Sequence, residues 1–154
     1  NADFVKFYAV LKEMCIELTK RIAADGEGAT KFLTYNIHGA KTFTDAKKVG
    51  MAIANSPLMK CAFFGEDPNV GRAICAVGYS QVKINPEKTV IKFGGVPVYA
   101  DGLVLKFDAD AVKKIMAAKD IVVDIELNLG EVDATVWSCD FSYEYVKING
   151  EYHT

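Results

Sequence analysis

The sequence lacks the markers of several large protein classes. It has no apolar run long enough to span a bilayer and no secretory hydrophobic segment. Its 154 residues carry a net charge of −2, with lysine and arginine scattered along the chain, which argues against a nucleic-acid or anionic membrane surface. Because 51% of the residues are hydrophobic and 25% are charged, the chain is typical of a globular protein. We expect a cytoplasmic protein with neither nucleic acid nor membrane as a partner.

Motifs for metals, disulfides and common cofactors are missing as well. The cysteines form no C-x-x-C pair, and His38 and His153 lie far apart in sequence. This favours free, buried thiols in a reducing cytosol and argues against a zinc site. P-loop, G-x-S-x-G, HExxH and Rossmann glycine patterns are also absent. We therefore expect no metal, no cofactor and no complete catalytic set in this chain. The four cysteines are Cys15, Cys61, Cys75 and Cys139.

Helical patterns dominate the first half of the chain. Apolar residues recur at three- and four-residue steps from 3 to 24, which predicts one long helix with Asp3 as its cap and Asp25-Gly26 as its stop. Alternation from Leu33 to Ile37 predicts a strand that ends at Gly39. Further helices are predicted from Thr44 to Asn55 with Thr44 as cap, from Ser56-Pro57 onward, and from Asn69 to Val77.

Strand patterns dominate the second half. Gly94-Gly95 joins two β-rich runs and predicts a hairpin, and Asp108 is placed to cap a short helix. Helices early and hairpins late indicate an α+β fold, in which helices cover a mixed or antiparallel sheet. We expect residues 1–154 to be a single domain or the C-terminal portion of a larger enzyme. The predicted strands are Thr89–Phe93, Val96–Ala100, Leu103–Phe107, Ile121–Leu127 and Asp133–Phe141, the last two around a turn at Leu129-Gly130.

The loop Asp25–Lys31 (DGEGATK) is the most informative segment. It holds Glu27 between two glycines, directly after the predicted long helix and before a strand. Glycine allows a backbone to approach a ligand closely, so a carboxylate in such a loop is well placed to meet an ammonium group. The alternative is an ordinary connection in which Glu27 is solvated, because short glycine patterns are weak signals.

Three other segments could carry chemistry, and each has a plain structural alternative. Ile53–Lys60 (IANSPLMK) could simply be the junction between two helices. Gly65–Arg72 (GEDPNVGR) could be an ordinary surface loop that leads into a helix. In the segment Val136–Thr154, Trp137 fits core packing, and Cys139 has no neighbouring histidine to make it a catalytic thiolate. The last residues could be a frayed terminus.

Together these four segments resemble the ornithine acetyltransferase family, the bifunctional glutamate N-acetyltransferases of arginine biosynthesis. They match in the family's order and spacing and span nearly the whole chain. One departure is Val70, where many relatives carry tryptophan. The resemblance implies the fold of the self-processing ornithine acetyltransferases, a precursor that cleaves itself before a threonine, and an assembly of two alpha and two beta chains.

The resemblance also implies a reaction. The new N-terminal threonine is the nucleophile, and it carries an acetyl group from N-acetylornithine to glutamate through an acetyl-threonine ester, without metal or coenzyme. Its substrate-binding positions fall on Glu27, Asn149 and Thr154 of this chain. These residues are expected to bind small amino-acid substrates.

The sequence departs from this pattern at its start. An autoprocessed nucleophile must be the first residue of its chain, and residue 1 here is Asn. The resemblance therefore implies a C-terminal part of the beta chain that has no catalytic residue of its own and is inactive alone. Its partners would be the alpha chain and the upstream part of the beta chain. A related self-processing amidase or aminopeptidase, and a non-catalytic binding or assembly module, stay open as alternatives.

Overall fold

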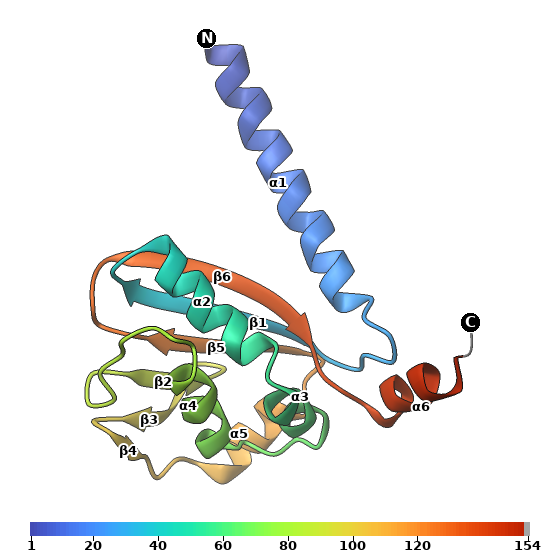
Figure 1. Cartoon of the computed structure of the whole chain (residues 1–154), viewed down its shortest axis with the longest axis vertical. Helices are drawn as coiled ribbons and strands as arrows, with labels where there is room; N and C mark the ends of the chain where they lie inside the picture. The colour runs from blue at the N-terminus through green and yellow to red at the C-terminus, as the bar shows by residue number, and fades with distance from the viewer. Residues whose placement is uncertain (153–154) are drawn as a thin grey trace.

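The computed structural model describes residues 1–152, which form six helices and one six-stranded sheet (Figure 1). The strand order is β4-β3-β2-β5-β1-β6. The central strands β1 and β5 are parallel, whereas the other neighbours are antiparallel, so the predicted α+β fold has a mixed sheet. The strands are β1 (Phe32–Ala40), β2 (Val90–Phe93), β3 (Val96–Ala100), β4 (Leu103–Val104), β5 (Asp120–Glu126) and β6 (Val132–Cys139). The helices are α1 (Ala2–Ala24), α2 (Phe43–Ala54), α3 (Pro57–Phe64), α4 (Val70–Gly78), α5 (Ala109–Met116) and α6 (Tyr143–Glu151).

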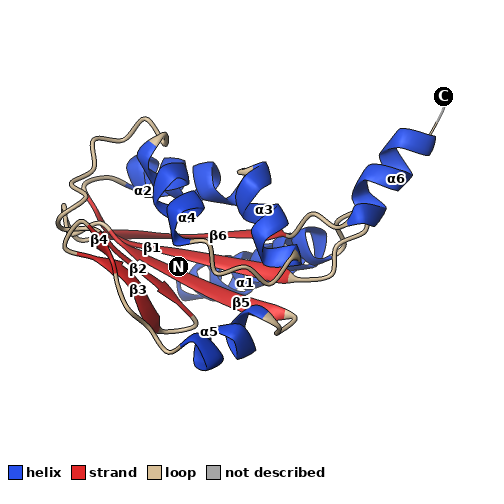
Figure 2. Ribbon diagram, turned by 90° about the horizontal axis from the view of Figure 1, so that it is seen from below, coloured by secondary structure: helices blue, strands red, loops and turns tan. Residues whose placement is uncertain are grey.

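One face of the sheet carries the hydrophobic core. Alternate residues of β1 are fully buried, and the register sets them beside equivalent residues of β5. Helices α2, α3 and α4 cover this face, as Figure 2 shows. The period of two along each strand therefore separates an apolar inner face from a polar outer one. The aligned inner pairs are Leu33 with Ile121, Tyr35 with Val123, and Ile37 with Ile125.

The hairpin and the late strands largely follow the predicted pattern. Gly94 and Gly95 have φ of 53° and 83°, the left-handed values that a two-residue hairpin turn requires at both positions. The predicted strand at 103–107 is shorter in the structure, because only Leu103–Val104 pair with β3. The strands β5 and β6 form as predicted but are not neighbours, since β1 lies between them.

The N-terminal helix forms with the predicted length but not with the predicted cap. Asn1, and not Asp3, caps α1, since the Asn1 side chain accepts a hydrogen bond from the Asp3 backbone N–H at 2.8 Å. The helix projects away from the sheet (Figure 1), and its apolar face is exposed to solvent. Its C-terminal turns approach the outer face of β6, where the Lys20 ammonium lies 5.5 Å from the centre of the Trp137 ring. Trp137 is thus half-buried under α1 and not part of the core.

Two further predictions need correction. Thr42, and not Thr44, caps α2, because the Thr42 hydroxyl accepts from the Asp45 backbone N–H at 3.1 Å. The cysteines are free, as expected, but not buried: three are exposed and Cys139 is half-buried. By contrast, Ser56 caps α3 with Pro57 at its first turn, as predicted. None of the helices within residues 1–152 is both long enough and apolar enough to cross a membrane.

Candidate functional site

A buried carboxylate fixes the loop that carries Glu27. Asp140, which directly follows β6, is only 1% exposed. Its Oδ1 accepts hydrogen bonds from the backbone N–H groups of Thr30 at 2.8 Å and Lys31 at 2.9 Å, and its Oδ2 accepts from the Thr30 hydroxyl at 2.5 Å. A buried carboxylate is costly unless its oxygens are satisfied, and here three donors satisfy them. The end of the loop is therefore held against the end of β6.

The glycines of this loop allow the C-terminal segment to pack against it. Gly28 has φ of 66°, and a Cβ at this position would lie 2.7 Å from the backbone nitrogen of Tyr145. The Ser142 hydroxyl donates to the Gly28 carbonyl at 2.5 Å. Ser142 occupies the cap position of α6, but its side chain makes no capping bond and instead donates to the loop. The start of α6 is thus tied to the loop and not only to its own first turn.

Aromatic contacts complete the attachment of α6. Tyr143 meets Phe64 of α3 edge to face, with ring centres 5.2 Å apart, and Tyr145 stacks on Phe141 at 4.4 Å. Ring pairs at such distances contribute about 0.5–1.5 kcal/mol beyond their buried area. The predicted short C-terminal tail is therefore a helix up to Glu151, and it is anchored at its N-terminal end.

The structure brings together two of the three predicted substrate-binding residues. The Asn149 amide nitrogen donates to Glu27 Oε2 at 2.8 Å, although the two residues are 122 positions apart in sequence. The same nitrogen donates to the Tyr145 carbonyl at 2.9 Å, so both of its hydrogens are used. Both side chains are exposed. The third predicted residue, Thr154, lies outside the described residues.

This pair presents acceptors to an incoming group. With both amide hydrogens of Asn149 engaged, its Oδ1 is left to accept, and Glu27 Oε1 makes no hydrogen bond within residues 1–152. No lysine or arginine of the described residues forms a salt bridge with Glu27. A carboxylate oxygen beside an amide oxygen is a suitable receptor for an ammonium group, which carries three donors and no acceptor.

Two buried lysines near this site were not singled out from the sequence. Lys31 is 8% exposed, and its ammonium donates to the Met116 carbonyl at 2.8 Å. Lys60 is 6% exposed, and its ammonium donates to the Ser138 hydroxyl at 3.0 Å and to the Cys139 carbonyl. Each lysine is the last residue of a sequence motif, Lys31 of Asp25–Lys31 and Lys60 of Ile53–Lys60. This position is the signal that could have identified them. Lys31 therefore ties the loop to the end of α5, and Lys60 ties α3 to the end of β6.

A second polar group lies on the outer face of the sheet. His38 of β1 approaches Asp133 of β6 at 3.0 Å and Asp124 of β5 at 3.6 Å. The hydrogen bond to Asp133 is the main cause that raises the pKa of His38 above its usual value, and the same bond lowers the pKa of Asp133. Among residues 1–152, no three His, Cys, Asp or Glu side chains are grouped to hold a metal ion.

Known proteins resemble this chain in sequence and in backbone structure. A family model described as the ArgJ family matches residues 1–154. The arginine biosynthesis bifunctional protein ArgJ of Staphylococcus aureus (strain COL) is 44% identical over 141 residues, which are 92% of this chain and 34% of that protein. ArgJ 1 of Clostridium acetobutylicum is 42% identical over 158 residues, covering 100% of this chain and 39% of that protein.

A solved structure extends the match to three dimensions. The crystal structure of the arginine biosynthesis bifunctional protein ArgJ from Bacillus halodurans superposes with a TM-score of 0.94 at 35% identity, covering 99% of this chain and 72% of that one. The expected fold is thereby confirmed. This chain spans little more than a third of the length of the curated relatives. Because the family model matches it from end to end and the backbone agrees throughout, the chain belongs to the ArgJ family.

Proposed function

We propose that this chain is part of a glutamate N-acetyltransferase that moves an acetyl group from N-acetylornithine to glutamate. Its place in the protein would be the C-terminal part of the beta chain, inactive alone, with the threonine nucleophile supplied from outside residues 1–154. Membership of the ArgJ family and the names of its relatives, which are arginine biosynthesis bifunctional proteins, support this proposal. Such a biosynthetic step fits the expected cytoplasmic location.

The observation that carries the proposal is the contact between Glu27 and Asn149. The sequence resemblance selects both residues independently as substrate-binding positions, and they meet at 2.8 Å from opposite ends of the chain. Their free acceptor oxygens suit the ammonium group of an amino-acid substrate. We propose that Thr154, three residues beyond α6, joins them and that the substrate lies between these groups and the nucleophile.

The proposed reaction divides one difficult transfer into two steps. The threonine hydroxyl attacks the acetyl carbonyl of N-acetylornithine, its free α-amine accepts the hydroxyl proton, and the amide C–N bond breaks as that proton passes to the leaving ornithine. The amino group of glutamate then attacks the acetyl ester, the C–O bond breaks, and the threonine oxygen regains a proton. Glu27 and Asn149 bind and orient both amino acids. This orientation accelerates the transfer because correct positioning removes an entropic cost.

The exposed face of α1 supports the proposed partners. Its large apolar side chains are 44–76% exposed, an apolar patch of a kind that usually marks an interaction surface. We propose that the alpha chain and the upstream part of the beta chain cover this face in an assembly of two alpha and two beta chains. The residues that form it are Phe4, Phe7, Leu11, Leu18 and Ile22.

The proposal is tested with Glu27→Gln in the full-length enzyme. A charge-assisted hydrogen bond to an ammonium group contributes about 1.5–3 kcal/mol, so kcat/KM for acetyl transfer should fall roughly tenfold or more. Glu131→Gln is the matched control, because it removes one exposed carboxylate away from the site. Unchanged kinetics in Glu27→Gln would remove Glu27 from the site. Hydrolysis of amino-acid amides without transfer to glutamate would instead identify an amidase.

A further inference from the structure

A hollow lies at the other end of the sheet from Glu27 and Asn149. It encloses about 210 Å³ and is lined where β1 and β5 end, at Ala40 and Leu127. Glu27 precedes the start of β1, so the whole length of this strand separates the two places. The carboxyl ends of adjacent parallel strands, beside the start of a helix, are where open α/β sheets commonly bind ligands. The eight lining residues are Ala40, Lys41, Asp45, Gln81, Val82, Lys83, Leu127 and Leu129.

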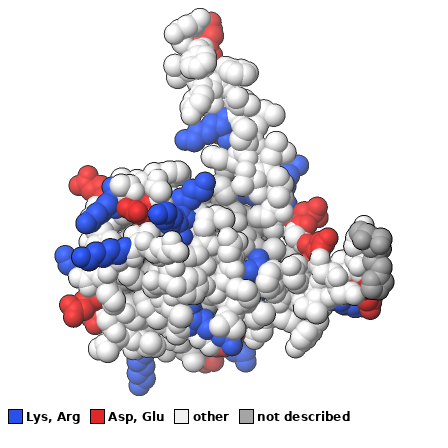
Figure 3. All heavy atoms as spheres, viewed as in Figure 1, with Lys and Arg blue, Asp and Glu red and all other residues white. Residues whose placement is uncertain are grey.

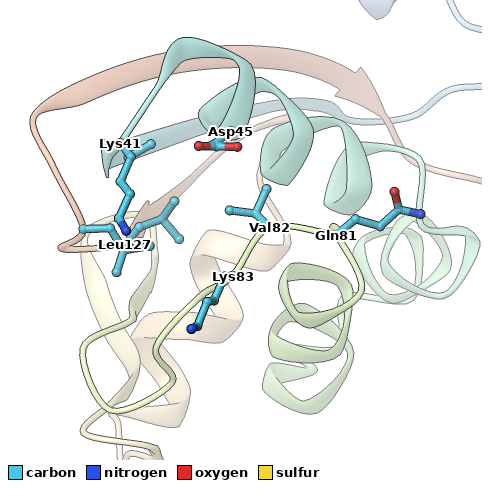
Figure 4. Close-up of a pocket in the computed structure, with 8 residues that line it drawn as sticks. Lys41, Asp45, Gln81, Val82, Lys83 and Leu127 are labelled. Atoms are coloured by element: carbon cyan, nitrogen blue, oxygen red, sulfur yellow. The ribbon is translucent and has the colours of Figure 1, made fainter.

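The residues that line this hollow are partly apolar and partly cationic. Leu127 is fully buried, and Leu129 and Val82 are half-buried beside it. Lys41 and Lys83 are both exposed, and neither forms a salt bridge with another residue in the described part of the chain. Figure 4 shows the Lys41 side chain reaching toward Leu127, with Lys83 on the neighbouring segment. The lining therefore combines two lysines that form no salt bridge with a few apolar side chains.

The surrounding charge favours an anion. Asp45 is the only acidic residue among the eight, and it lies in the first turn of α2, so the lining keeps a net positive charge. Figure 3 shows further basic side chains gathered over α2, and the sequence of that helix supplies Lys47 and Lys48. The N-terminus of α2 adds the positive end of a helix dipole. A ligand with carboxylate groups on a short apolar stem fits both parts of this lining.

The backbone beside the hollow is held in an uncommon conformation. Gln81 has φ of 63° and Asn128, between the two lining leucines, has φ of 53°, values that L side chains adopt infrequently. The Asn128 amide donates to the Lys88 carbonyl at 2.8 Å, which ties the β5–β6 turn to the segment before β2. This hydrogen bond constrains the turn that carries Leu127 and Leu129.

We propose that this hollow is a binding site for a small organic carboxylate, distinct from the site at Glu27 and Asn149. Lys41 and Lys83 pair with the carboxylate groups, while the half-buried Val82 and Leu129 contact the stem. The volume of about 210 Å³ restricts the ligand to the size of an amino acid or a short dicarboxylic acid. The proposal does not depend on the acetyl-transfer chemistry, because none of its residues takes part in that chemistry.

The test is isothermal titration calorimetry on the full-length protein with glutarate, a five-carbon dicarboxylate, as the probe. Saturable binding is expected in the wild type, in the matched charge control Lys113→Gln/Lys114→Gln on the opposite side of the sheet, and in Glu27→Gln. Lys41→Gln/Lys83→Gln should weaken the affinity at least tenfold and leave the melting temperature unchanged, because both side chains are exposed and unpaired. Glutaramide, the neutral diamide of the same size, should bind at least tenfold more weakly than glutarate.

Several results would overturn the proposal. Absence of saturable glutarate binding to the wild type would remove the site. Equal affinity in the wild type and in Lys41→Gln/Lys83→Gln would show that binding occurs elsewhere, and loss of binding in Glu27→Gln alone would assign it to the acetyl-transfer site. Equal binding of glutaramide would exclude recognition of charge.

Discussion

Asp140 is the residue on which the geometry of the Glu27 loop depends most. Replacing it with alanine removes three hydrogen bonds, from the Thr30 backbone N–H, the Thr30 hydroxyl and the Lys31 backbone N–H. Replacing it with asparagine is the matched comparison. The asparagine carbonyl can still accept from both N–H groups, and its amide can donate to the Thr30 hydroxyl oxygen.

The magnitude follows from burial. A hydrogen bond to a charged group contributes about 1.5–3 kcal/mol, and an unpaired buried donor costs about 1–3 kcal/mol. These terms overlap, since the hydroxyl can turn to water and the loop can relax. We expect Asp140→Ala to lower the free energy of unfolding by about 3 kcal/mol and Asp140→Asn by about 1 kcal/mol. Because the loop presents Glu27 to Asn149, KM for both proposed amino-acid substrates should rise in parallel with the loss of stability.

The assay is urea unfolding of the full-length protein, with the midpoint and slope fitted separately, together with substrate kinetics well below the unfolding midpoint. A change of less than about 0.5 kcal/mol in Asp140→Ala would refute the claim that this carboxylate holds the loop. An unaltered KM in a destabilised Asp140→Ala protein would separate the loop from substrate binding.

Three other predictions concern the loop glycine, the outer face of the sheet and the C-terminal tail. Gly28→Ala should cost about 1–3 kcal/mol in backbone strain and also displace Tyr145, whereas Gly95→Ala, at positive φ but in open space, should cost the strain alone; melting temperatures of the two variants compare them. The hydrogen bond to Asp133 raises the pKa of His38 above 6.5, so its stabilisation is complete below pH 6.5 and is lost as pH rises through the raised pKa. Urea unfolding of Asp133→Asn should show a weaker pH dependence, because only Asp124 then raises the pKa of His38. Removing Tyr152–Thr154 should raise KM with little effect on melting temperature, and an unchanged KM and kcat would exclude the tail from the site.

Much of the fold could be predicted from local patterns. The period of two in β1 and the Ser56-Pro57 helix start are decided by neighbouring residues, and both were confirmed. The helix caps could not be assigned from local pattern, because Asn, Asp and Thr side chains can all accept a hydrogen bond from a helix N–H. The observed caps, Asn1 and Thr42, each lie two residues before the predicted caps, Asp3 and Thr44.

Other features depend on contacts that the sequence does not reveal. The apolar pattern of α1 predicts a helix correctly but cannot say what covers it, and the described residues leave it exposed. The insertion of β1 between β5 and β6 is a property of topology and not of either strand's pattern.

The candidate site, too, was predictable in part from the sequence and in part only from the folded structure. Glu27 and Asn149 were selected through resemblance, and their contact required the folded chain, since α6 must first be anchored by Ser142 and Tyr143. Asp140 gave no distinctive local signal, because an aspartate after a strand is common at turns. Its role becomes visible only when the loop 110 residues earlier is seen to donate to it.

The central claim is that Glu27 and Asn149 bind the ammonium group of an amino-acid substrate. The most direct measurement is a crystal structure of the full-length enzyme with ornithine bound. The account predicts a ligand ammonium within about 3 Å of the Glu27 carboxylate, with the Asn149 amide oxygen as a second acceptor. Ornithine bound in a pocket that neither residue lines would contradict it.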